Sequence, residues 1–165
     1  MRLFTAIDIP SSLKNEIEKI LKPLDMPGLK KINPDSIHLT LSFYKDEDPF
    51  IIREKLKKIK FNPFYITIKG FGFFPNISNP RVLWFGVEKN NHLNDLKNWI
   101  KKENFTPHIT VARLNKVDVK KIISFLMKKE INFKFLVKDI KLYKSELTSL
   151  GAVHSVLEKY EAIKE

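Results

Sequence analysis

Residues 38–41, His-Leu-Thr-Leu, and residues 108–111, His-Ile-Thr-Val, repeat one pattern in which a histidine, an apolar residue, a threonine and another apolar residue follow one another. The side chains of a strand alternate between its two faces. The pattern therefore predicts two strands, over residues 37–43 and 107–113. Each would carry its histidine and threonine on one face and its apolar side chains in a core.

The same alternation assigns faces to the neighbouring residues. It puts Ser42 on the face of His38, and it puts Phe43 on the core face. Arg113 comes five residues after His108, so strict alternation assigns it to the far face. Only a bulge or the end of the strand would turn this side chain toward the histidine.

Paired histidines on two similar strands suit an in-line displacement at phosphorus. One imidazole takes a proton from the attacking oxygen while the other gives a proton to the leaving oxygen. An unperturbed histidine pKa of about 6.5 lets the ring fill either role near neutral pH. A threonine hydroxyl can donate a hydrogen bond to a non-bridging phosphate oxygen. We therefore expect two catalytic histidines and two phosphate-binding threonines: His38, His108, Thr40 and Thr110.

The sequence lacks the common signatures of other phosphate and metal chemistry. It contains no Gly-Lys-Ser/Thr phosphate loop, no His-Glu-x-x-His and no His-x-His pair. We therefore expect a reaction that needs no ATP, no metal and no other cofactor.

The composition indicates one basic domain. The chain has 165 residues, with 30 Lys and Arg against 19 Asp and Glu, and no Cys, which excludes disulfides and zinc–thiolate sites. This length suffices for one core, so we expect residues 1–165 to form a single domain. The net charge of +11 favours polyanions, and RNA, DNA and anionic membranes all qualify. No apolar run approaches the ~18 residues of a membrane span, and the first residues do not resemble a signal peptide, so we expect a cytoplasmic protein without a membrane partner.

Periodicity and turn residues predict an α+β fold in the order β-α-β-α-β-β-α-β-α-β-β, which is too strand-rich for a helical bundle. The predicted strands cover residues 2–8, 37–43, 64–74, 81–87, 107–113, 133–147 and 152–162. The first predicted helix is capped by Ser11 or Ser12, and the second is capped by Asp48 and begins at Pro49. Two more helices are expected near residues 91–103 and 118–129.

Other aromatic residues and histidines receive structural assignments. Trp84 and Trp99 lie at apolar positions and are predicted to be in the core. For the phenylalanines within residues 70–74, core packing is favoured over stacking on an RNA base. His92 and His154 have no partner pattern and are assigned to the surface.

Six blocks of the sequence resemble the two-histidine (2H) phosphoesterases, and within them the RNA 2′,3′-cyclic phosphodiesterases, historically called 2′-5′ RNA ligases. The blocks follow one another along nearly the whole chain: MRLFTAIDIP at 1–10, IHLTL at 37–41, GFGFFP at 70–75, RVLWFGV at 81–87, PHITVAR at 107–113 and SELT at 145–148. The resemblance implies a bilobal, pseudo-twofold α+β domain. Two antiparallel sheets would face each other across a central cleft, with the helices on the outside.

The resemblance also implies roles for single residues. The family's first-motif histidine donates a proton to the leaving 3′ oxygen and its second-motif histidine accepts one from water, which maps these roles to His38 and His108. The product would be a 2′-phosphate end. The threonines of the two motifs would hold the phosphate, and the family's basic residue after the second motif falls on Arg113. The reverse reaction would join RNA ends by a 2′-5′ linkage without ATP.

Two departures from the family pattern concern the fit of the substrate. The stretch over residues 87–107 is short, and Phe-Tyr-Lys at 43–45 stands where many relatives have Phe-Leu-Gly. Neither departure touches the two histidines or the two threonines.

The sequence supports three functions. The first is a monomeric, metal-independent phosphodiesterase that acts on cyclic-phosphate-terminated RNA, tRNA fragments included. The second is a non-catalytic module that binds RNA ends, although binding alone needs no paired acid and base. The third keeps the same site and acts on a small cyclic nucleotide.

Overall fold

The computed structural model of the chain describes residues 2–163, which form four helices, one 3-10 turn and nine strands. The strands are β1 (Arg2–Asp8), β2 (Leu29–Lys31), β3 (His38–Tyr44), β4 (Phe64–Phe74), β5 (Val82–Val87), β6 (His108–Leu114), β7 (Asn132–Val137), β8 (Asp139–Thr148) and β9 (Gly151–Glu161). The helices are α1 (Ser11–Leu21), α2 (Pro49–Leu56), α3 (Asn91–Ile100) and α4 (Val119–Met127), and the 3-10 turn η1 spans Pro34–Ser36. The predicted α+β class is confirmed.

The strands form a single antiparallel sheet in the order β7-β4-β5-β6-β3-β1-β8-β9. Its two halves meet at β6 and β3, where Leu39 pairs with Ile109. Beyond this pair, the edge of β6 is occupied by β2, with Lys31 opposite Ala112. The two predicted sheets are therefore two halves of one sheet, and the halves diverge on either side of their shared pair.

The strands β3 and β6 are local copies of each other. Each has seven residues, and the sequence of buried, half-buried and exposed positions is the same in both. Each strand also has an irregularity at the same place, because the pairing of β1 with β3 shifts between Thr5 and Ala6, and that of β5 with β6 shifts between Leu83 and Trp84. The chain thus places similar strands around an approximate twofold axis.

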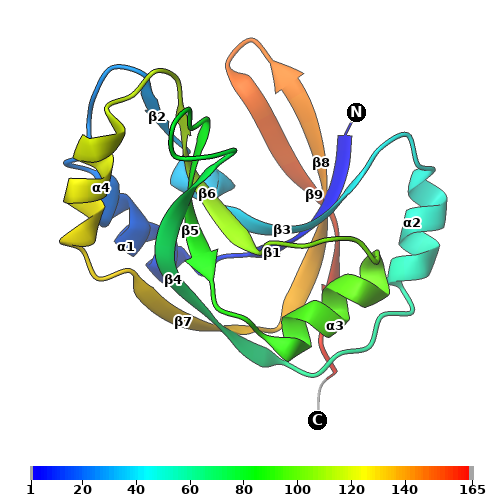
Figure 1. Cartoon of the computed structure of the whole chain (residues 1–165). Coiled ribbons are helices and arrows are strands. Elements are labelled where there is room, and N and C mark those ends of the chain that lie inside the picture. The colour runs from blue at the N-terminus through cyan, green and yellow to red at the C-terminus, as the bar shows by residue number, and fades with distance from the viewer. Residues whose placement is uncertain (1, 164–165) are drawn as a thin grey trace.

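The core lies on the outer side of the sheet, beneath the helices. Leu39 and Leu41 of β3 and Ile109 and Val111 of β6 are buried in it. The helices contribute their apolar stripes: Ile17 and Leu21 of α1, Ile52 and Leu56 of α2, Leu93, Leu96 and Ile100 of α3, and Ile122 and Leu126 of α4. Figure 1 shows α1 and α4 together at one end of the molecule, α2 and α3 at the other, and the β8–β9 hairpin extending beyond the sheet. Within residues 2–163, no helix is long and apolar enough to cross a membrane.

The prediction of one long strand over residues 133–147 is wrong. The chain leaves the sheet at Lys138, so that β7 pairs with β4 while β8 pairs with β1 and β9 in the other half. Burial shows the break, since positions 135 and 137 are buried and then positions 140 and 142, one residue out of phase. The strand β2 was not predicted, because an element of three residues carries too few positions for a period.

Two local predictions are also corrected. No side chain caps α1: Pro10 occupies the cap position, and its carbonyl accepts hydrogen bonds from the amides of Leu13 and Lys14. Trp99 was predicted to lie in the core but is 40% exposed, with the Nζ of Lys55 5.6 Å from the centre of its ring. The other predicted cap is present, since the carboxylate of Asp48 accepts from an amide in the first turn of α2.

Candidate active site

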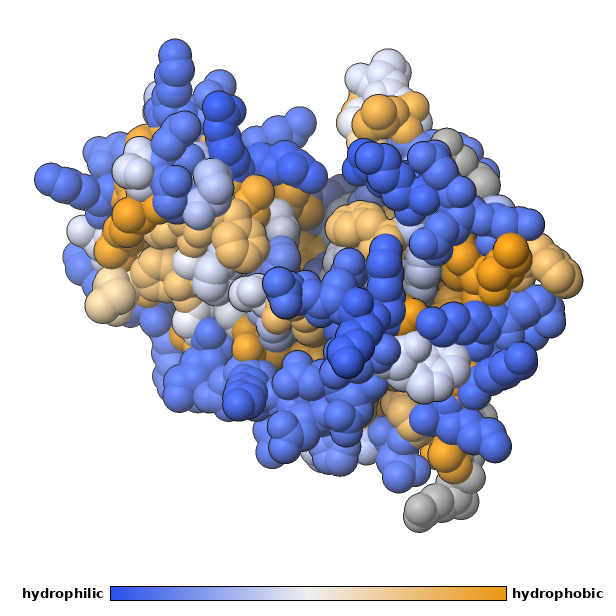
Figure 2. Space-filling view, turned by 45° about the vertical axis from the view of Figure 1, so that its right-hand side comes forward, coloured by the Kyte–Doolittle hydropathy of each residue, from blue (hydrophilic) through white to orange (hydrophobic). Residues whose placement is uncertain are grey.

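The two repeated motifs line one cavity of about 630 Å³ between the halves of the sheet. His38, Thr40, His108, Thr110 and Arg113 all contribute to its wall. Because β3 and β6 are antiparallel and Leu39 pairs with Ile109, the register sets each histidine on the side of the other strand's threonine. Figure 2 shows that the body is hollowed beside the projecting hairpin and that hydrophilic side chains cover most of this face.

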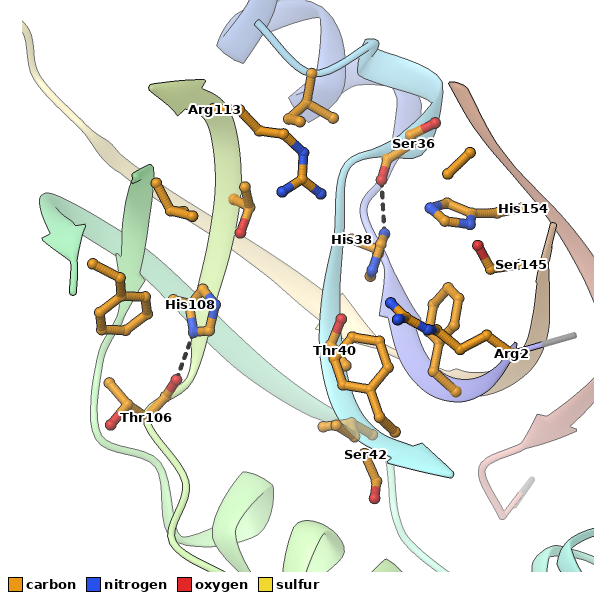
Figure 3. Close-up of a pocket in the computed structure, with 18 of the residues that line it drawn as sticks. Arg2, Ser36, His38, Thr40, Ser42, Thr106, His108, Arg113, Ser145 and His154 are labelled. Carbon is orange, nitrogen blue, oxygen red and sulfur yellow. Dashed lines mark hydrogen bonds between the residues drawn. The ribbon is translucent and has the colours of Figure 1, made fainter. Parts of the chain in front are cut away.

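A bulge in each strand changes which side chains reach the cavity. In β6 the partner of Leu83 is Ala112 and that of Trp84 is Thr110, so Val111 is the extra residue. The bulge brings Arg113 back to the cavity, where strict alternation would not have placed it. Figure 3 shows its guanidinium pointing between the two strands.

The equivalent bulge in β3 overturns the alternation predicted for its last residues. Ser42 was expected on the open face; it borders the cavity, but it is only 2% exposed and its Oγ is buried. Phe43 was expected in the core but is 53% exposed and lines the cavity. Phe43 therefore occupies in β3 the position that Arg113 has in β6.

Both histidines are held by the same kind of hydrogen bond. The Nδ1 of His38 lies 2.7 Å from the carbonyl oxygen of Ser36, and the Nδ1 of His108 lies 2.7 Å from that of Thr106 (Figure 3). A carbonyl oxygen only accepts, so Nδ1 carries the hydrogen in both rings. The Nε2 of each ring is therefore the nitrogen that can exchange a proton with a ligand.

The His38 ring lies in an aromatic cluster. Its centroid is 5.1 Å from the ring of Phe4, which stacks on Tyr143, and 5.6 Å from the ring of His154. Burial lowers the pKa of His38, and the hydrogen bond to the Ser36 carbonyl only partly offsets this effect. The surroundings therefore favour the neutral imidazole in the free protein.

A partly buried ion-pair cluster lies beside the same histidine. Asp8 is opposite His38 in the sheet, and its carboxylate lies 2.9 Å from the Nζ of Lys14 and 3.1 Å from that of Lys141. Burial acts to raise the pKa of Asp8, but the hydrogen bonds from both lysines outweigh burial and lower it. The carboxylate stays ionised, and its charge acts to raise the pKa of His38.

The His108 ring lies against Phe74 and Trp84. Its centroid is 4.9 Å from the Phe74 ring in an edge-to-face contact and 6.3 Å from that of Trp84. Phe74 lines the cavity, so it is not the core residue that was favoured from the sequence, whereas Phe71 and Phe73 do pack against the core. A Cβ on Gly72 would lie 2.2 Å from the Trp84 ring, so only glycine leaves room for this indole.

A buried lysine holds the loop that leads to His108. The Nζ of Lys97 donates to the Lys101 carbonyl at 2.9 Å and to Oε1 of Glu103 at 2.7 Å, with only 2% of its side chain exposed. The same Nζ lies 5.6 Å from the centre of the Phe105 ring. The hydrogen bond from Lys97 lowers the pKa of Glu103. One cation thus fixes three points of the loop that ends in the carbonyl acceptor of His108.

The carbonyl acceptor of His38 is held by different means. Ser36 ends the turn η1, in which the Oδ1 of Asn33 accepts from the amide of Asp35 at 3.0 Å. The amide of Ser36 also donates to the carbonyl of Asn33. The two halves therefore reach the same histidine geometry with a capped 3-10 turn on one side and a buried lysine on the other.

His154 is the residue that the sequence reading misplaced most. It was assigned to the surface, but its ring lies in the cavity beside His38. Burial lowers its pKa. No sequence motif indicates that His154 lies in the cavity, because its location depends on the register of the β8–β9 hairpin, in which His154 pairs with Ser145. Arg2, which was not predicted as a site residue, also lines the cavity.

No metal centre is formed by the described part of the chain. Among residues 2–163, no group of three or more His, Asp or Glu side chains is placed to hold a metal ion.

Known proteins resemble this chain over almost its whole length. The chain is 34% identical to the RNA 2′,3′-cyclic phosphodiesterase of Methanocaldococcus jannaschii, over 97% of this chain and 100% of that protein. It is 32% identical to the protein of the same name from Archaeoglobus fulgidus, over 98% and 100% of the two chains.

Solved structures share the fold. The crystal structure of TT0787 from Thermus thermophilus matches with a TM-score of 0.79 and 25% identity, covering 98% of this chain and 97% of that one. E. coli LigT complexed with 3′-AMP matches with a TM-score of 0.81 and 23% identity, covering 99% and 98%. The family profile described as LigT like Phosphoesterase matches residues 7–84 and 88–154. With its two histidine motifs on one cavity, the chain belongs to the family of LigT-like phosphoesterases.

Proposed function

We propose that the protein hydrolyses the 2′,3′-cyclic phosphate at the end of an RNA and leaves a 2′-phosphate. The observation that carries the proposal is the pair of imidazoles on one cavity, each with Nδ1 bonded to a carbonyl and Nε2 available to a ligand. The relatives named RNA 2′,3′-cyclic phosphodiesterase support the same activity. The net charge of +11 favours a polyanionic substrate.

The reaction uses one proton transfer on each side of the phosphorus. The Nε2 of His108 takes a proton from water while the water oxygen forms a bond to phosphorus. The bond between phosphorus and the 3′ oxygen breaks, and the Nε2–H of His38 gives its proton to that oxygen. The hydroxyls of Thr40 and Thr110 donate hydrogen bonds to the non-bridging oxygens, and Arg113 compensates the negative charge that develops there.

Substrate binding prepares the acid. Burial lowers the pKa of His38 in the free protein, which disfavours the protonated form that the reaction needs. A bound phosphate brings a negative charge next to the ring, and a nearby anion favours imidazolium. The substrate therefore raises the pKa of the residue that protonates its leaving group.

The test is an end-group analysis. An RNA oligonucleotide with a 2′,3′-cyclic phosphate is incubated with the protein and excess EDTA, and the product is identified by ³¹P NMR. We expect a 2′-phosphate, formed at an undiminished rate in EDTA. His38→Ala and His108→Ala should each lower the rate by about 10²–10⁴-fold. A 3′-phosphate product, loss of activity in EDTA, or unchanged rates in both variants would contradict the proposal.

Two related outcomes are read from the same preparation. Salt-sensitive RNA binding without turnover would identify a non-catalytic module that binds RNA ends. Incubation of a 2′-phosphate- or cyclic-phosphate-ended RNA with a 5′-hydroxyl RNA tests the reverse reaction. A 2′-5′-linked product that forms without ATP from the cyclic end would add ligation to the activity.

A further inference from the structure

Three polar side chains form a row across the wall next to His38. In the sheet Arg2 of β1 is directly opposite Ser145 of β8, and Ser145 is directly opposite His154 of β9. Directly opposite residues of antiparallel strands point to the same face. All three side chains line the cavity that contains His38 (Figure 3).

Within residues 2–163, the row has unused capacity to bind a ligand. Arg2 is exposed, and no carboxylate of the described chain forms an ion pair with its guanidinium. The nearby carboxylate of Glu146 is bound to Lys144 at 2.8 Å. The Nδ1 of His154 is buried and has no hydrogen-bond partner in the described part of the chain. A buried nitrogen of this kind normally has a partner, from the protein, water or a ligand.

This inference rests on the proposed function. The direction of the proposed reaction decides which part of the RNA reaches the row. Water attacks from the side of His108, and His38 protonates the leaving 3′ oxygen. The ribose that carries this oxygen therefore lies on the side of His38. The rest of the RNA continues from that ribose through its 5′ oxygen, and so toward the wall that His38 shares with His154, 5.6 Å away between ring centres.

We propose that Arg2, Ser145 and His154 form a second subsite, which binds the phosphodiester that precedes the terminal nucleotide. The guanidinium fits two phosphate oxygens at once, and the hydroxyl and an imidazole N–H each donate one further hydrogen bond. Such contacts to the backbone carry no sequence information but position the chain. The site therefore selects an oligonucleotide end over a mononucleoside cyclic phosphate, which has no such phosphodiester.

The experiment compares three substrates. They are a mononucleoside 2′,3′-cyclic phosphate, a dinucleotide ending in the same cyclic phosphate, and that dinucleotide with an uncharged methylphosphonate as its internal linkage. For the unmodified protein we expect kcat/KM to be roughly 10–100-fold higher for the phosphodiester dinucleotide than for the other two. Arg2→Gln should remove most of this preference and leave the rate on the mononucleoside substrate unchanged.

Two further variants make the result specific. Ser145→Ala should reduce the preference by a smaller factor, and it keeps the inference testable should Arg2→Gln fail to fold. Lys19→Gln removes an equal charge from the outer side of α1, where 74% of the Lys19 side chain is exposed, and should keep the full preference. His154 is not used as the test, because its ring contacts His38 and its loss would also disturb the acid.

The outcomes separate this inference from the proposed function. Equal kcat/KM on the phosphodiester and methylphosphonate dinucleotides, or equal losses on all substrates in Arg2→Gln, would overturn the subsite while the hydrolase stands. Hydrolysis of none of the three would refute the proposed function. In that event the affinities of the two dinucleotides, each ending in a 2′-phosphate, still decide whether Arg2 binds the internal phosphate.

Discussion

The two histidines share one hydrogen-bond geometry but lie in different surroundings. His38 is stacked on Phe4 and lies beside His154, whereas the His108 ring meets the edge of Phe74. Burial lowers the pKa of His38, so the free protein holds this imidazole in its neutral form over more of the pH range. In the proposed reaction, the protonation of His38 therefore depends on the substrate as much as on the protein.

This arrangement predicts a pH shift upon substrate binding. The profile of kcat/KM reports the free enzyme and that of kcat reports the complex. A bound phosphate raises the pKa of the His38 imidazole, because its negative charge favours the protonated form. We therefore expect a bell-shaped kcat profile centred at higher pH than the kcat/KM profile. Steady-state rates between about pH 4.5 and 9, which bracket the ordinary histidine pKa, measure both, and coincident profiles would refute this coupling.

Single residues also show how far the sequence could be read. Alternation predicted that the histidine and threonine of each motif share one face of their strand, and all four of these side chains line the cavity. Arg113 and Phe43 were not, because a bulge adds one residue to each strand and reverses every later side chain. His154 reaches the cavity only through the hairpin register, which depends on pairs far from any motif.

At the scale of elements, the loop before β6 makes a test of positioning possible. Lys97→Met removes the cation that binds Lys101 and Glu103, while Glu103 stays partly exposed to water. We expect kcat to fall by about tenfold, because a misplaced carbonyl at Thr106 no longer orients the His108 ring. The Nδ1–H signal of His108 in ¹H–¹⁵N NMR spectra should move or broaden.

The signal of His38 is the internal control, because its acceptor belongs to η1 and not to this loop. Lys97→Arg should restore part of the rate by keeping the charge. Equal changes in both histidine signals would show a general loss of structure, and an unchanged rate would show that the loop holds without the lysine.

The helix starts give a prediction about stability. The carboxylate of Asp48 accepts from the amide of Phe50 at 2.9 Å, whereas Ser11 makes no capping hydrogen bond for α1. Asp48→Ala should therefore lower the free energy of unfolding by about 1 kcal/mol, and Ser11→Ala should leave it nearly unchanged. Urea unfolding curves measure both variants, and similar losses in the two would contradict the assigned caps.

Element boundaries were predictable where they coincide with a change in pattern. The starts of β1, β4 and α2 follow from alternation or from Asp48 before Pro49. The division between β7 and β8 was missed because apolar residues alternate on both sides of Lys138. Only the phase of the alternation changes there, from odd to even positions. A phase change of one residue is a weak signal in a single sequence, although it separates strands of opposite halves.

For the whole molecule, partly buried histidines with lowered pKa values make stability depend on pH. The folded-state pKa values of His38 and His154 are lowered from 6.5, so the unfolded chain binds more protons in this range. Stability is therefore fully present above about pH 6.5 and is lost as the pH falls through the lowered values.

Urea unfolding at intervals from about pH 7.5 to 5 measures this slope. We expect the free energy of unfolding to decrease across the range, and the double variant His38→Gln, His154→Gln to show a smaller decrease. Carboxylates such as Asp8 titrate at lower pH and act outside this window. A slope that is unchanged in the double variant would assign the effect to other groups.

The joining of the halves into one sheet could not be foreseen. It depends on the pairing of Leu39 with Ile109 and on β2 alongside β6. Both contacts join segments about 70 or more residues apart, and local periodicity contains no information on such distances. The repeated motif indicated two related halves, but not how their edges meet.

The near-equivalence of β3 and β6 carries a consequence for regiochemistry. A perfectly symmetric pair of half-sites would accept the cyclic phosphate in either of two opposed orientations, and would open it at the 2′ or the 3′ oxygen with equal ease. Phe43 and Arg113 break that equivalence, because an exposed aromatic ring in β3 occupies the position that a cation has in β6. Phe43→Ala should accordingly let a minor fraction of the 3′-phosphate end form beside the 2′-phosphate, because Arg113 still distinguishes the two orientations. An unmixed product would show that Phe43 takes no part in the choice of scissile bond.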